Sequence, residues 1–102
     1  MIRKTTPEQA EKVNAAVDGR IMFSSSKFES ILLTLKPGEV IPEHNNPFDV
    51  LFIGLAGTAT VKSSDKILTL EPKQTIFITS EEPRQMENHT DNPIAVMVVK
   101  IF

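Results

Sequence analysis

The stretch that decides the fold is Gly38-Glu39-Val40-Ile41-Pro42-Glu43-His44-Asn45-Asn46, continuing through Pro47-Phe48-Asp49-Val50-Leu51-Phe52 to Gly57. It begins in the turn signal Lys36-Pro37-Gly38, which stops a preceding apolar run. Its second half is apolar from Val50 to Leu55 and ends at Ala56-Gly57. This alternation of short apolar runs and turn residues is typical of a β-rich domain.

Further short runs, bounded by turn residues, lie on both sides of this stretch. They are Ile21–Phe23, Phe28–Leu35, Thr58–Lys62, Ile67–Leu70, Thr75–Thr79, Arg84–Asn88 and Ile94–Phe102. Seven or eight short strands with turns at close intervals predict an antiparallel sandwich or barrel.

One helix is predicted before the strands. Thr6 is a capping residue, Pro7 stands at the first helical position, and Gln9 follows three residues after the cap. An apolar helical face would then consist of Ala10, Val13, Ala16 and Val17, and Asp18-Gly19 would end the helix. We therefore expect a short helical segment over residues 1–20 that lies across a sheet, and a barrel over residues 21–102.

Composition narrows the possible functions. The chain has 102 residues, which fits one domain, and a net charge of −2 with acidic and basic residues interspersed. Without a basic footprint, nucleic-acid binding has little support. There is no cysteine, which excludes disulfides, zinc–thiolate sites and thiol nucleophiles. The N-terminus has no signal-peptide pattern and the longest apolar run, Ile94–Val99, is too short for a bilayer, so we expect a cytoplasmic protein without membrane contact.

The opening stretch resembles the first motif of the cupin superfamily, in which a glycine, two spaced histidines, a glutamate and a closing glycine follow one another. Lys73–Thr79 together with Pro83–Asn88 resembles the second motif. The resemblance covers about residues 21–102 and is greatest to small single-domain cupins with a Glu-His pair followed by Pro-Phe-Asp. It implies an all-β fold, a small antiparallel jelly-roll barrel, and a homodimer. It does not imply one activity, because this fold hosts many.

In metal-binding cupins, three histidines and a glutamate hold the ion. Alignment on Gly38, Gly57 and Asn88 places His44, Asn46, Val50 and Arg84 at those positions. Asn46 is a poor transition-metal ligand, valine cannot ligate, and arginine would repel the ion. The resemblance therefore implies a degenerate metal site, and we expect no metal and no other cofactor. Lys73-Gln74 also replaces the usual Gly-Asp turn, which removes the residue that most easily adopts a left-handed conformation.

Two enzymatic alternatives stay open. His44 could bind a metal with Glu43 or Asp49, although strand alternation points both carboxylates away from the interior unless a bulge near Pro47 changes the register. His44 could also act as an acid–base group in an isomerase- or dioxygenase-like cupin. The serines form no recognisable nucleophile motif.

The preferred hypothesis is a metal-free binding or sensing module for a small molecule, with an anion as one option. We expect its pocket at the barrel mouth to contain His44, Asn46, Phe52, Ile78, Arg84 and Met86. A further alternative is a domain for oligomerisation or partner contact. A homodimer is expected because the last strand is apolar at both parities through Val99, so that both of its faces need cover.

Arg84 has two possible roles. Its stem could pack inside while the guanidinium reaches water or an acidic residue such as Glu43 or Glu82. Alternatively, Arg84 could anchor a carboxylate or phosphate in the pocket, because its planar fork matches both groups.

Overall fold

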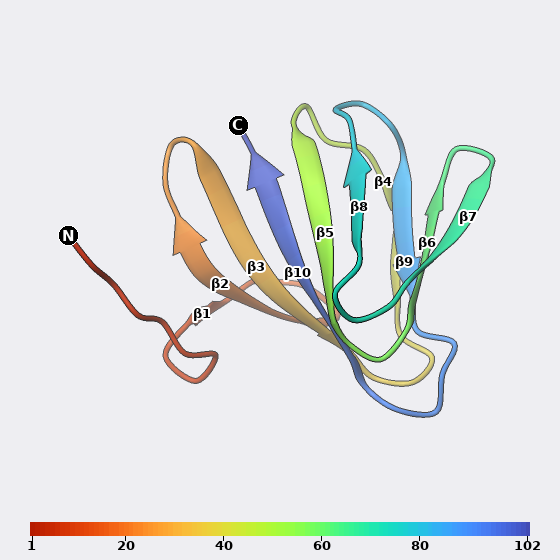
Figure 1. Ribbon diagram of the computed structural model, residues 1–102, viewed down its shortest axis with the longest axis horizontal. Helices are drawn as coiled ribbons and strands as arrows, with labels where there is room; N and C mark the ends of the chain where they lie inside the picture. Colours follow the sequence, from red (N-terminus) through yellow and green to blue (C-terminus); the bar gives the residue numbers. More distant parts are fainter.

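The computed structural model describes residues 1–102 as two antiparallel sheets that face each other. The ten strands are β1 Glu11–Lys12, β2 Asp18–Ser24, β3 Phe28–Leu35, β4 Val40–His44, β5 Asp49–Ala56, β6 Ala59–Ser63, β7 Lys66–Leu70, β8 Thr75–Ile78, β9 Arg84–Glu87 and β10 Ile94–Ile101. The six-stranded sheet has the order β1-β2-β3-β10-β5-β8, and the four-stranded sheet has the order β4-β9-β6-β7 (Figure 1). The predicted all-β jelly-roll fold is confirmed. No helix of the chain is long and apolar enough to cross a bilayer.

The core lies between the two sheets and follows from strand alternation. In β5, Val50 and Phe52 are buried, and in β10 every second residue from Ile94 to Val98 is buried. The four-stranded sheet contributes Val61 and Met86 to the same cluster. Successive side chains of a strand point to opposite faces, so one parity of each strand forms the core.

The predicted N-terminal helix is wrong. One turn forms, in which the Thr6 carbonyl accepts hydrogen bonds from the amides of Gln9 and Ala10. The chain then becomes extended, because β1 pairs with β2 and the Val13 amide donates to the Gly19 carbonyl at 2.9 Å. An isolated helical turn is costly to nucleate, whereas an extended segment beside β2 obtains its backbone hydrogen bonds from the sheet.

Two strands, β1 and β4, lie outside the predicted set. Both are at sheet edges, and β4 contains Pro42, which is tolerated at an edge because no ladder hydrogen bond from its nitrogen is needed. The β4–β9 pairing also contains a register shift between Ile41 and His44. This irregularity decides which way His44 points.

The turn before β8 keeps a left-handed residue without glycine. Lys73 has a φ of 72°, so the lysine itself takes the conformation that glycine would adopt most easily. Its amide donates to the Gly54 carbonyl at 3.0 Å, and the Gly54 amide donates to the Gln74 carbonyl at 2.9 Å. These hydrogen bonds hold the turn against β5.

Candidate ligand pocket

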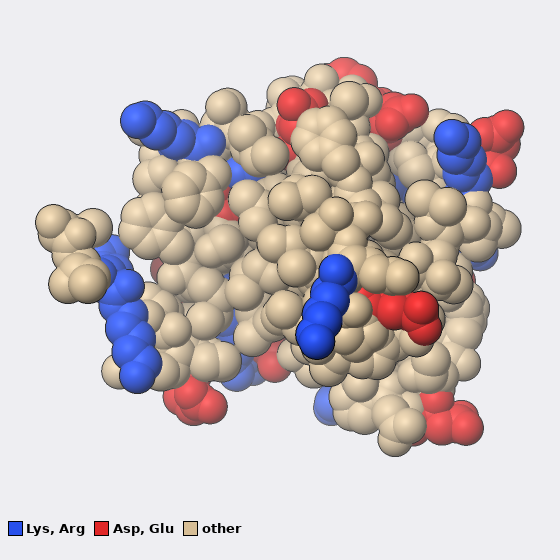
Figure 2. All heavy atoms as spheres, viewed as in Figure 1, with Lys and Arg blue, Asp and Glu red and all other residues tan.

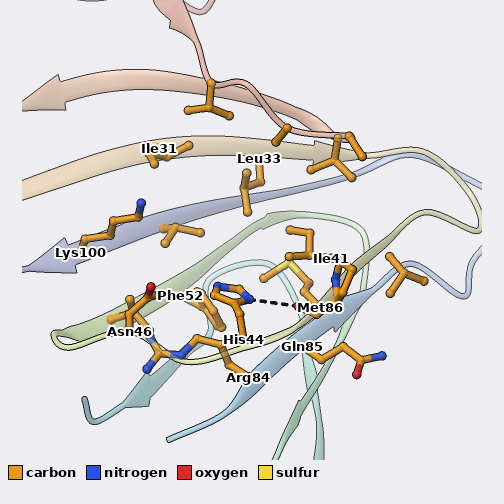
Figure 3. Close-up of a pocket in the computed structure, with 18 residues that line it drawn as sticks. Ile31, Leu33, Ile41, His44, Asn46, Phe52, Arg84, Gln85, Met86 and Lys100 are labelled. Carbon is orange, nitrogen blue, oxygen red and sulfur yellow. Dashed lines mark hydrogen bonds between the residues drawn. The ribbon is translucent and has the colours of Figure 1, made fainter. Parts of the chain in front are cut away.

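A cavity of about 310 Å³ opens between the two sheets. Three parts of the chain form its wall: the inner face of the six-stranded sheet, strands β4 and β9, and the segment that connects β1 to β2 (Figure 3). Twelve of its eighteen lining residues are hydrophobic. Ligand sites typically have volumes of about 300–1,000 Å³, apolar walls and a few polar groups, so this cavity falls at the small end of that range.

Five of the six residues predicted for the pocket line this cavity, namely His44, Asn46, Phe52, Arg84 and Met86. Ile78 is 3% exposed and belongs to the packed core, but it is not part of the cavity wall. It lies opposite Val50 in the β5–β8 pairing, where Val50 is the partner that reaches the cavity. Ile78 therefore packs behind the wall of this cavity rather than lining it.

His44 reaches the cavity because of the irregular β4–β9 pairing. Ile41 is paired with Met86 and His44 with Arg84, so three steps along β4 match two along β9. This extra residue brings Ile41 and His44 to the same side of the sheet despite their odd spacing. Glu43 is not among the lining residues, in agreement with the expected alternation.

The tautomer of His44 follows from its hydrogen bond. Its Nδ1 lies 3.0 Å from the Pro42 carbonyl oxygen, which can only accept, so Nδ1 carries the proton (Figure 3). Nε2 has no partner in the chain and is an acceptor in the neutral imidazole.

Arg84 is the most buried charged residue of the site, at 2% exposure. Its Nε and Nη2 donate to the Glu82 carbonyl at 3.3 and 3.1 Å, and Nη2 also donates to the Thr79 carbonyl at 3.3 Å. Nη1 is buried without a hydrogen-bond partner. In Figure 3 the guanidinium points toward Asn46. The expectation that it would reach water or a carboxylate is therefore wrong, because its partners are main-chain carbonyls.

Burial lowers the pKa of Arg84 from its ordinary value, while the carboxylates of Glu82, Asp49 and Glu81 oppose that shift. An arginine titrates so far above neutrality that the side chain stays charged. The cavity therefore contains a buried cation.

Lys100 is a site residue that the sequence reasoning missed. It lines the cavity and lies opposite Val50 in the β5–β10 pairing. Its Nζ lies 3.8 Å from the Glu29 carboxylate and 5.7 Å from the centroid of the Phe48 ring. Strand alternation could have predicted its position, because Lys100 lies two residues after Val98 and four after Val96, which both point inward.

The segment between β1 and β2 was also absent from the predicted pocket. Val13 and Val17 line the cavity together with the two alanines between them. Their apolar spacing had predicted a helical face. The same side chains instead cover the cavity from an extended segment.

A transition metal does not fit this arrangement. The four family ligand positions do converge on the cavity, but they present one imidazole, one amide, a valine and a guanidinium. No group of three or more histidine, cysteine, aspartate or glutamate side chains could hold an ion. Asp49, a predicted alternative ligand, does not line the cavity and accepts a hydrogen bond from the Ser80 amide at 2.8 Å.

The comparisons with known proteins agree with this fold. The structure of TT1209 from Thermus thermophilus has a TM-score of 0.84 at 22% identity, covering 99% of this chain and 97% of that one. The cupin domain of an XRE family transcriptional regulator from Enterobacter cloacae has a TM-score of 0.77 at 19% identity, covering 86% and 98%. The DMSP lyase DddQ from Ruegeria pomeroyi has a TM-score of 0.77 at 18% identity, covering 95% of this chain and 54% of that one.

At these identities, the structural similarity establishes the fold alone. No curated protein matches the sequence. The sequence model of the cupin domain matches residues 31–100, most of the chain. This protein belongs to the cupin family.

Proposed function

We propose that this protein binds a small organic molecule, without a metal, in the cavity between its two sheets. One observation carries the proposal: the four positions that hold the ion in metal-binding cupins line an apolar cavity here, and one of them is the buried cation Arg84. A cavity with apolar walls and few polar groups suits a ligand that is held by burial and oriented by a few hydrogen bonds.

The apolar walls and the polar groups of the cavity can make different contacts with a ligand. Phe52, Met86 and Val98 offer apolar contact, and each is at most 6% exposed. His44 and Arg84 offer one free acceptor and one free donor nitrogen. A binding or sensing role needs no further chemistry.

Catalysis by His44 is the second candidate. The unpartnered Nε2 is the atom that a general base requires, and the imidazole is already oriented by the Pro42 carbonyl. The fold is compatible with both roles, because it is shared by the domain of a transcriptional regulator and by a lyase. Catalysis would require a substrate proton within hydrogen-bond reach of Nε2, whereas binding requires only the cavity.

A thermal-shift screen of small organic molecules tests the binding function. Val98 lines the cavity while its neighbour Val99 points to the other face of β10, so Val98→Phe fills the cavity and Val99→Phe is the matched control. A compound at ten times its Kd should stabilise the protein by about 1.4 kcal/mol, or roughly 5 °C in Tm. The shift should persist in Val99→Phe and vanish in Val98→Phe. Equal responses of the two variants, or no stabilising compound at all, would contradict the proposal.

A further inference from the structure

We propose that the ligand is a small monocarboxylate, with its carboxylate on Arg84 Nη1 and its apolar body against the inner face of the six-stranded sheet. This inference rests on the proposed binding function and adds the chemical class of the ligand.

The first argument is that the buried Arg84 cation has no direct ion pair. All of its hydrogen bonds go to neutral main-chain carbonyls, and no carboxylate forms an ion pair with it. A buried cation without a directly bonded counter-ion is costly, and the cost falls when an anion supplies both charge and hydrogen bonds. A neutral ligand would satisfy Nη1 but would leave the cation without a direct ion pair, because Glu82, Asp49 and Glu81 act on it only through space.

The second argument concerns the number of negative charges. Nη1 is the one buried side-chain nitrogen without a partner. The other cation of the cavity, Lys100, already lies 3.8 Å from Glu29. Glu82, Asp49 and Glu81 add negative potential around Arg84. A second charge on the ligand would find no free cation and would be repelled, so a monoanion is favoured over a phosphate dianion.

The third argument concerns the position of the carboxylate. The guanidinium points toward Asn46 in Figure 3, and the hydrogen bond of Asn46 within the chain is made by its main-chain carbonyl, which accepts from the Glu81 amide at 2.8 Å, so its side-chain amide is free. Its amide can therefore donate to the second carboxylate oxygen while Nη1 donates to the first. Val50, which replaces the family glutamate, lines the cavity and leaves space for an apolar body. The volume of about 310 Å³ limits that body to a short branched chain or a single ring.

Calorimetric titration of matched acids and amides tests this class. Propionate, isovalerate and benzoate are titrated into the native protein beside propionamide, isovaleramide, benzamide and inorganic phosphate. At least one carboxylate should bind ten or more times more tightly than its amide, and phosphate should not bind. The same carboxylate should lose its affinity in Arg84→Met and keep it within threefold in Arg20→Met, which removes an arginine that lies outside the cavity wall and pairs with Asp18.

The variant Asn46→Asp provides a second test of the carboxylate position, which can be used if Arg84→Met does not fold. An aspartate at position 46 would supply an internal carboxylate toward which the guanidinium already points. It should raise Tm and abolish carboxylate binding.

The two possible failures are distinguishable. If no carboxylate binds better than its amide, or if Asn46→Asp binds carboxylates as the native protein does, the monocarboxylate inference is wrong. Neutral compounds that bind in the cavity would still support the binding function. If neither these probes nor any screened compound binds, both proposals are wrong.

Discussion

His44 and Arg84 lie opposite each other in the β4–β9 pairing, and both line the cavity between the two sheets. In the family these positions belong to two different motifs and carry ligands of one metal ion. Here one of them is a cation that is 2% exposed. The ligand positions of a metal site are thus retained in space, but one of them is now a buried cation that cannot bind a metal ion.

The replacement of metal-ligating residues at these positions predicts that protein purified without chelator contains no stoichiometric transition metal. Three of the four ligand positions have lost their metal-binding groups, and a guanidinium beside a divalent cation adds repulsion. The triple variant Asn46→His, Val50→Glu, Arg84→His should gain affinity for Zn²⁺ or Ni²⁺ if the barrel tolerates it. Elemental analysis is the measurement, and close to one metal per native chain would show that the ligand set has been misidentified.

We expect a homodimer in which the outer face of the six-stranded sheet is buried. The residues of β10 that point away from the core are Ala95, Met97 and Val99. The half-exposed Leu55 of β5 and Phe77 of β8 belong to the same sheet. The centre of the face in Figure 2 carries few charged side chains. The structure has no N-terminal helix that could cover this outer face. We therefore expect a second subunit to bury it.

Light scattering at micromolar concentration should give twice the chain mass of 11.3 kDa. Met97→Asp places a charge in the middle of the outer face and should reduce the mass to that of one chain. Lys66→Asp, on a strand of the other sheet, is the control and should leave the dimer intact. A native monomer would contradict the expected dimer.

Glu87 makes stability depend on acid pH. Burial raises the pKa of this carboxyl, but hydrogen bonds and charges from Lys62 and His89 outweigh burial and lower the pKa below its ordinary value. A group with a lowered folded pKa stabilises the protein above its unfolded pKa, and this contribution is lost as the pH falls through the folded value.

Glu87→Gln should therefore lower Tm near neutral pH, and the difference from the native protein should shrink as the pH falls below the ordinary range of a glutamate. Glu43→Gln is the matched control, because Glu43 is exposed and forms no ion pair. A difference that stays constant between pH 7 and pH 3 would mean that the Glu87 contacts do not depend on its charge.

The left-handed Lys73 predicts a stabilising glycine. A non-glycine residue in this conformation costs roughly 1–2 kcal/mol, and the added flexibility of an unfolded glycine offsets part of the gain. Lys73→Gly should therefore raise stability by up to about 1 kcal/mol in denaturant unfolding. Lys36→Gly, at an exposed turn residue without a positive φ, should instead be neutral or destabilising by about 0.5–1 kcal/mol. Equal effects at both positions would show that the Lys73 turn is unstrained.

Strand parity made much of the site predictable from the sequence. Val50 and Phe52 point inward as alternation requires, and motif spacing brought His44, Asn46 and Arg84 to one place. The direction of His44 was predicted, but the reason for it was not, because the register shift after Ile41 arises from pairing with β9. A bulge depends on the partner strand, and a single sequence does not specify that partner.

The N-terminal segment shows the opposite outcome. Its local signals were correct, since Thr6 and Gln9 do form a capped turn in which the Gln9 side chain accepts from the Thr6 amide at 3.3 Å. Tertiary pairing with β2 prevailed over them, and Val13 and Val17 became part of the cavity wall. Lys100 is hard to recognise from the sequence, because it follows an apolar run and only its parity with Val96 and Val98 places it on the inner face.

Methyl NMR of methionine-labelled protein tests the central claim most directly. Met86 is 2% exposed and lines the cavity, whereas Met97 points to the opposite side of the six-stranded sheet, so one spectrum contains a reporter and its control. During titration with isovalerate, the Met86 methyl signal should shift saturably while the Met97 signal stays in place, and the shift should disappear in Arg84→Met. If Met86 does not respond to isovalerate or to any other small molecule, the cavity is not a binding site.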